Sequence, residues 1–123
     1  MREAPFPLWT NVALPASGGP VVTTPVLLEN IFGFSIQIVW TGTPVGVFTI
    51  QGSNDLGFKN LQTGAVTGVT NWTPLTSGTI SAAGSAANGM FNDVGAYFRW
   101  VQISYAPTSG TGTASANMQI KGL

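Results

Sequence analysis

Apolar and polar residues alternate along several short stretches of the chain, which is the pattern of β-strands with one buried face. The segments 34–41 (FSIQIVWT) and 113–121 (TASANMQIK) each place their apolar side chains on one face. The segment 97–105 (YFRWVQISY) is apolar on both faces, which is typical of a central strand or of a contact between subunits. No stretch has the apolar spacing that an amphipathic helix requires.

Glycine, proline and other turn residues separate these stretches along the whole chain. We predict strands at residues 8–14, 21–29, 34–41, 45–52, 71–76, 79–83, 89–92, 97–105 and 113–121. The segment 53–70 is a long polar excursion with three glycines, and it has room for a small hairpin. Strands of this length and spacing predict an all-β fold, an antiparallel two-sheet β-sandwich of about eight strands.

Residues 1–20 differ from the rest, because they contain four prolines and cannot form a regular hairpin over their whole length. We expect them to be an extended N-terminal arm or an edge strand, followed by a single β-sandwich domain over residues 21–123. If the segment is an arm, Phe6, Leu8 and Trp9 would supply its buried area by running along the edge strand of a neighbouring molecule.

The charged fraction excludes several functions. Only 7% of residues are Asp, Glu, Lys or Arg, and the formal net charge is zero, whereas about 25% charged residues is usual. We therefore expect no nucleic acid as partner, because phosphate neutralisation needs a basic stripe. We also expect no membrane contact, because there is neither a basic patch nor a long apolar run. So few charges indicate either a surface coated with neutral polar groups or one buried in an assembly.

The sequence predicts no catalytic site, cofactor or metal site. Cysteine and histidine are absent, which excludes disulfides, thiol nucleophiles and Ser-His catalysis. The acidic residues Glu3, Glu29, Asp55 and Asp93 are scattered and lack the neighbours that a carboxylate pair or a calcium site would need. We expect a protein that is not an enzyme. The start of the chain lacks the apolar core of a signal peptide, so we expect synthesis in the cytoplasm.

Tryptophan and arginine residues are the remaining candidates for binding. Trp40 and Trp100 are in phase with apolar neighbours and are predicted core residues. Trp9 and Trp72 lie where exposure is easier, so they either pack inside the protein or stack on a sugar ring. Arg99 either stacks on Tyr97 or Trp100, or pairs with Asp93 or with an acid of a neighbouring subunit.

Three stretches resemble a group of small bacteriophage structural proteins. They are residues 40–55 (WTGTPVGVFTIQGSND), residues 71–75 (NWTPL), and residues 97–105 (YFRWVQISY) followed by SGTGT at 109–113. The resemblance extends from Trp40 to Gly122, about two thirds of the chain. In similar proteins the Ser-Asn-Asp segment leads quickly into the Asn-Trp segment, so residues 56–70 resemble an inserted loop.

The resemblance implies a jelly-roll-like β-sandwich with a role in the virion, and it supplies no catalytic or ligand-binding residue. We expect a capsid decoration or cement protein on the capsid surface, with the major capsid protein and further copies of itself, as a homotrimer, for partners. The alternative is a jelly-roll module of a fibre, spike or tail that binds a cell-surface glycan. The candidate interaction residues are Phe6, Leu8, Trp9, Trp72 and Arg99.

Overall fold

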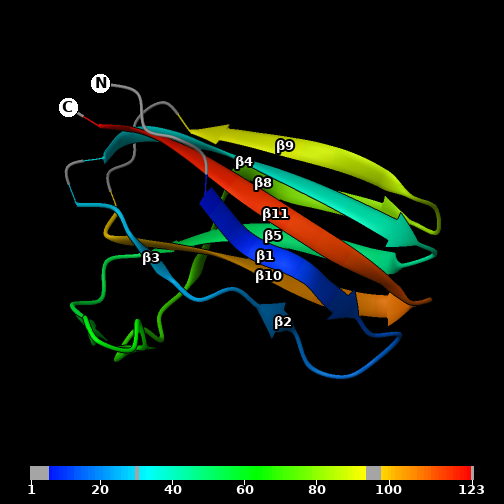
Figure 1. The fold of residues 1–123 in the computed structure, drawn as a ribbon, viewed down its shortest axis with the longest axis horizontal. Helices are drawn as coiled ribbons and strands as arrows, with labels where there is room; N and C mark the ends of the chain where they lie inside the picture. The colour runs from blue at the N-terminus through cyan, green and yellow to red at the C-terminus, as the bar shows by residue number, and fades with distance from the viewer. Residues whose placement is uncertain (1–5, 30, 94–97, 123) are drawn as a thin grey trace.

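The computed structural model describes residues 6–29, 31–93 and 98–122, and it shows two antiparallel β-sheets packed face to face (Figure 1). The predicted all-β sandwich is confirmed. The strands are β1 (Phe6–Leu14), β2 (Val21–Val22), β3 (Val26–Leu27), β4 (Ile31–Gly42), β5 (Val45–Ser53), β6 (Phe58–Lys59), β7 (Val66–Thr67), β8 (Thr73–Ala83), β9 (Ala87–Asp93), β10 (Trp100–Ser109) and β11 (Gly112–Gly122).

The strand order follows from folding the chain as one long hairpin. The first strand pairs with the last, β1 with β11; then β2 and β3 pair with β10, β4 with β9, and β5 with β8. Two further pairings, β11 with β4 and β10 with β5, roll this hairpin into a four-stranded sheet (β1-β11-β4-β9) and a five-stranded sheet (β2-β10-β5-β8, with β3 on β10). This connectivity is a jelly roll in which β2 and β3 are two parts of one strand.

Several strand boundaries differ from the prediction. The predicted strand 21–29 is broken into β2 and β3, and between them Thr23 makes two hydrogen bonds, from its N–H to Ile103 O (3.0 Å) and from Ile103 N–H to its Oγ1 (2.9 Å). The predicted strands 71–76 and 79–83 are one strand, β8, bent by a bulge near Ser77, whose φ is +59°. The predicted strand 97–105 corresponds to β10, which begins at Trp100 and continues to Ser109.

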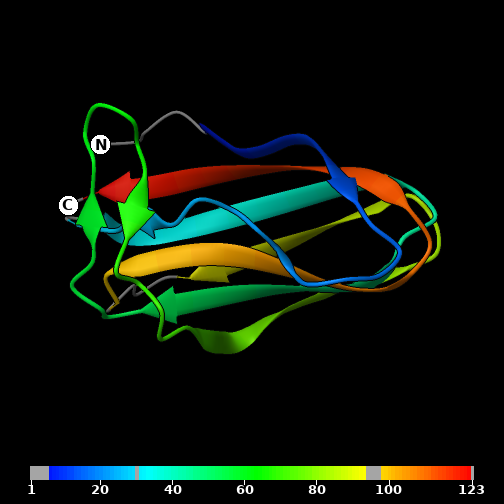
Figure 2. The same cartoon turned by 90° about the horizontal axis from the view of Figure 1, so that it is seen from below.

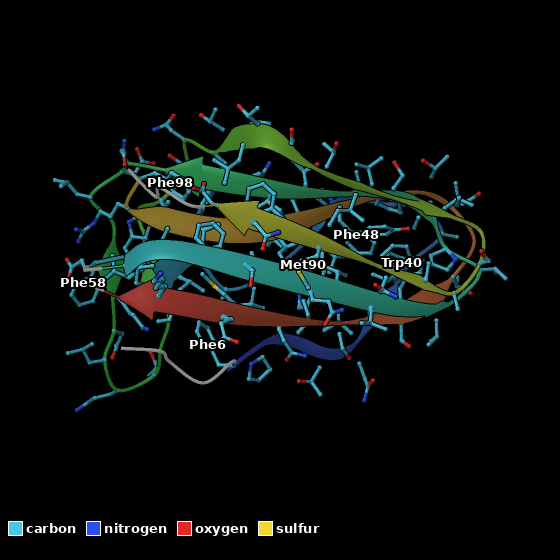
Figure 3. The ribbon with its side chains drawn as sticks, turned by 90° about the horizontal axis from the view of Figure 1, so that it is seen from above. Phe6, Trp40, Phe48, Phe58, Met90 and Phe98 are labelled. Carbon is cyan, nitrogen blue, oxygen red and sulfur yellow. The ribbon has the colours of Figure 1, made fainter. Side chains whose placement is uncertain are left out.

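The core lies between the sheets and is rich in aromatic rings (Figure 3). The alternating residues of β4 point inward as predicted, and those of β11 do the same. Phe48 on β5 is completely buried, and its ring lies 4.6 Å from Tyr105, 5.2 Å from Trp40 and 6.2 Å from Trp9, measured between ring centroids. These separations are within the range of favourable aromatic pairing.

Tyr105 makes Gly46 necessary. A Cβ on Gly46 would lie 2.6 Å from the phenolic Oη of Tyr105 and 2.5 Å from the Ala106 carbonyl oxygen, so a larger residue cannot fit without displacing β10. The Oη is buried, and none of the described residues is hydrogen-bonded to it. Burial raises the pKa of the Tyr105 phenol above its usual value, so the side chain stays neutral at physiological pH.

Candidate functional site

The most distinctive surface feature is the segment between β5 and β8, here called the 54–72 loop. It projects from one end of the sandwich and carries the short β6–β7 hairpin (Figure 2). The predicted small hairpin within residues 53–70 is therefore confirmed. Asn60 shapes its turn, because its Oδ1 accepts hydrogen bonds from the N–H groups of Gln62 (2.9 Å) and Thr63 (3.2 Å).

Asp55 closes the base of this loop. Its Oδ2 accepts hydrogen bonds from the backbone N–H groups of Thr70 and Asn71, both at 2.8 Å, and its Oδ1 accepts one from Asn71 Nδ2 at 3.0 Å. Residues separated by 15 and 16 positions in sequence are thus joined at one carboxylate. The loop has the closed base of a compact surface loop whose ends lie close together.

The same hydrogen bonds determine how Asp55 responds to pH. Donation from Asn71, first from its backbone and then from its side chain, and from Thr70 lowers the pKa of the Asp55 carboxyl below its usual value of 3.8. Because the folded state favours the ionised carboxylate, this contribution to stability is present above the unfolded pKa. It is lost as the pH falls through the folded pKa.

Two consecutive residues, Arg99 immediately before β10 and Trp100 at its start, hold the other side of the loop base. Trp100 donates from Nε1 to the Asp55 carbonyl oxygen at 3.0 Å. Arg99 donates from Nε to the Leu56 carbonyl oxygen at 2.8 Å and from its backbone N–H to Asn54 Oδ1 at 2.9 Å. Three consecutive loop residues, 54 to 56, are therefore hydrogen-bonded to the start of β10 and the residue before it.

At this fixed base and beyond it, the loop exposes large apolar side chains. Leu56, Phe58 and Leu61 are 81%, 65% and 90% exposed, and we call these three residues the apolar tip. Phe58 lies at the end of the sandwich, well away from the buried Phe48 and Trp40 (Figure 3). Exposed apolar residues that gather on one element, rather than lying singly on the surface, are typical of a contact with a partner.

The apolar tip is absent from the predictions made above, because residues 53–70 are described there only as a polar excursion. A signal was present: Leu56, Phe58 and Leu61 are large apolar residues in a glycine-bounded segment that has no alternating strand pattern to bury them. Apolar residues in such a segment remain exposed unless a neighbouring element covers them.

The five predicted interaction residues fall into two groups. Phe6, Leu8 and Trp9 lie on β1, and Trp72 and Arg99 lie at the 54–72 loop. On β1, Trp9 is buried in the core of its own chain, and Phe6 and Leu8 are half-buried against that core. β1 is the edge strand of the four-stranded sheet and pairs with β11 of the same chain. Trp72 is half-buried and lies immediately before β8, at the end of the 54–72 loop.

Arg99 belongs to the second group, at the loop base. Its Nη1 lies 3.2 Å from Glu29 Oε1, and its guanidinium carbon lies 5.6 Å from the centre of the Trp100 ring. The predicted stacking on an aromatic neighbour is present, on Trp100, whereas the acid within ion-pair distance is Glu29, where Asp93 was the predicted partner. The ion pair is half-exposed, so it contributes little to stability.

Asp55→Asn is expected to loosen the loop without unfolding the sandwich. The amide has one oxygen where the carboxylate has two, and it lacks the charge that strengthens the hydrogen bonds from Thr70 and Asn71. Hydrogen-exchange mass spectrometry should show faster exchange across the 54–72 loop, and the wild-type loop should show the same change as the pH falls below 3.8. Amides of the β4–β11 ladder are the internal control. Unchanged exchange in the loop would show that Asp55 does not hold it.

A second surface lies on the outer face of the four-stranded sheet. A shallow depression of about 370 Å³ is lined by Ser35, Gln37, Met90, Asn117 and Gln119. Its lining has amide and hydroxyl groups but neither a charge nor an aromatic ring. It can donate and accept hydrogen bonds, and its lining residues include no general base that could activate the Ser35 hydroxyl.

Within the described ranges, the structure holds no cluster of three or more His, Cys, Asp or Glu residues that could bind a metal ion. The same part of the chain includes no helix long and apolar enough to cross a membrane.

Comparison with known proteins shows a likeness at the level of the fold. No protein-family model matches the sequence, and no curated protein sequence matches it significantly. Among solved structures, the chain is similar to the SPBc2 prophage-derived protein YomS, with a TM-score of 0.50 and 8% sequence identity. The similarity covers 98% of this chain and 96% of YomS. The jelly-roll sandwich described above is therefore a fold that a prophage-derived protein also has.

Proposed function

We propose that this protein is a non-enzymatic structural protein of a bacteriophage particle, and that it decorates the capsid surface and bridges subunits of the major capsid protein. The observation that carries the proposal is the apolar tip held on a fixed base. The sequence resemblance to phage structural proteins and the fold shared with a prophage-derived protein support the phage setting.

The loop is built to bind a protein surface with little loss of entropy. Asp55, Arg99 and Trp100 already order its base, so less conformational freedom remains to be lost on binding. Burying a leucine or phenylalanine side chain completely is worth about 1.5–3 kcal/mol. The three side chains of the apolar tip can therefore anchor a contact even though few charges are available for ion pairs.

The test compares two pairs of surface substitutions. Phe58→Ser with Leu61→Ser removes two residues of the apolar tip, whereas Val22→Ser with Val39→Ser changes two valines that are 49% and 44% exposed elsewhere. Each protein is incubated with phage particles stripped of this protein, and binding is measured by co-sedimentation. The first pair should weaken binding by about tenfold or more, since about 1.4 kcal/mol corresponds to a factor of ten. The second pair should bind like the wild type. Equal binding by all three proteins would show that the tip is not the contact.

A glycan-binding role on a fibre, spike or tail is the second candidate, and the half-exposed Trp72 beside the loop favours it. Sugar rings stack on aromatic faces but also need converging polar groups. The two roles differ in copy number, because a decoration protein covers the capsid and a receptor-binding module occupies few positions. The intensity of this band relative to the major capsid protein on a gel of purified particles distinguishes them.

A further inference from the structure

Among the described residues, the two packed sheets have four edges, and three of these carry features that prevent another strand from pairing with them. β1 contains Pro7 and two register shifts. The edge formed by β2 and β3 has only two residues in each strand, with Pro25 between them. β8 contains Pro74 and the bulge at Ser77. Prolines, bulges and very short strands are the usual means by which proteins protect exposed edges.

The fourth edge, β9, has none of these features. Its seven residues pair with β4 in seven consecutive pairs without a register shift, from Ala87 with Trp40 to Asp93 with Phe34. It contains no proline and no lysine. A regular, unprotected edge of this kind is a template for pairing with a further strand.

The residues of β9 are complementary to a second copy of themselves. The sequence 87–93 is ANGMFND, with asparagines placed symmetrically at two positions on either side of Met90. An antiparallel pair centred on Met90 sets Asn88 opposite Asn92 of the second copy, and Met90 opposite Met90. On the other face, Gly89 lies opposite Phe91. No two like charges face each other in this register, and side chains directly opposite are the main stabilising pairs of a sheet.

The exposure of these side chains fits the same arrangement. Met90 is 57% exposed on the outer face, although it is a large apolar residue at the centre of the edge. Gly89 faces inward, where a Cβ would lie 2.6 Å from Ile80 Cγ2.

We propose that β9 is a self-association edge, at which two copies of this chain pair antiparallel about a two-fold axis through Met90. The two four-stranded sheets then form one continuous eight-stranded sheet. The sequence favours a homotrimer, whereas β9 provides a specific surface for a pair. Figure 1 shows β9 at a different edge from the 54–72 loop, so pairing leaves the apolar tip free.

Cysteine cross-linking tests this pairing directly, because the chain contains no cysteine of its own. Opposite residues in an antiparallel pair have Cα atoms about 4.5 or 5.5 Å apart, and both distances suit a disulfide. Met90→Cys should therefore form a covalent dimer under mild oxidation, with a mass twice that of the 12.8 kDa chain. Val39→Cys is the matched control, since it is also exposed on the outer face but lies one strand further from the axis. It should stay uncross-linked.

The register has its own test. Asn88→Cys and Asn92→Cys should cross-link when the two variants are mixed and far less when each is alone.

Light scattering of the wild-type protein at tens of micromolar should give twice the chain mass, and Met90→Arg should weaken this dimer by about tenfold or more. A wild-type mass equal to that of one chain, or three times that mass, would overturn the proposal. Cross-linking of Met90→Cys no faster than that of Val39→Cys would also overturn it. The Phe58→Ser and Leu61→Ser variant should remain dimeric, which keeps this test separate from the capsid-binding test.

Discussion

Phe48→Ala is expected to lower the free energy of unfolding by about 3–5 kcal/mol, the usual cost of removing a buried phenylalanine side chain. Phe48 is completely buried, and its ring is in contact range of Trp9, Trp40 and Tyr105. These rings belong to both sheets, so the cavity left behind would lie between the two layers and remove contacts with each of them. A domain of this size is stable by only about 5–15 kcal/mol. Urea denaturation followed by tryptophan fluorescence measures the loss.

Phe58→Ala is the matched control, because it is the same substitution at a side chain that is 65% exposed. Its effect on the free energy of unfolding should stay within about 0.5 kcal/mol, as is usual for surface positions. If the two variants lose similar stability, the assignment of Phe48 to the core and Phe58 to the surface is wrong.

Deletion of residues 1–14 is expected to abolish cooperative folding at 37 °C. The deletion removes β1, and with it the buried side chains of Trp9 and Leu14 and the ladder partner of β11. Loss of a buried leucine alone costs about 2–5 kcal/mol, and the truncated protein also leaves β11 as a long unpaired edge. Thermal melting followed by near-ultraviolet circular dichroism measures the effect.

Two point variants separate the contribution of the core from that of the strand. Leu14→Ala, at a side chain that is 1% exposed, should reproduce part of the loss, whereas Thr10→Ala, on the exposed side of β1, should change little. A truncated protein with a native melting curve would show instead that residues 1–14 are an arm that the sandwich does not need. The proline content of this segment made both outcomes compatible with the sequence.

The candidate site could be predicted only in part. Residues 53–70 were recognised as a long connection with room for a hairpin, and Trp72 and Arg99 were chosen as interaction residues. The hydrogen bonds by which Asp55 joins the two ends of the loop are not predictable from the sequence. The donors, the backbone N–H groups of Thr70 and Asn71, lie 15 and 16 positions from Asp55 and share no local pattern with it. The role of Arg99 as an anchor of the loop base depends in the same way on Leu56, which is 43 positions away.

By itself the sequence determined that the elements are strands and that they form a sandwich, because alternation along 34–41 and 113–121 identifies a buried face without any knowledge of the neighbouring strands. It also determined that catalysis by histidine or cysteine is impossible. The tertiary structure alone decided which strands are edges, that Trp9 belongs to the core of its own chain, and that Leu56, Phe58 and Leu61 remain exposed. The physical reason is the separation in sequence of the residues involved. Alternation depends on residues two positions apart, whereas edge position and exposure depend on which distant strands pair and pack to form the jelly roll.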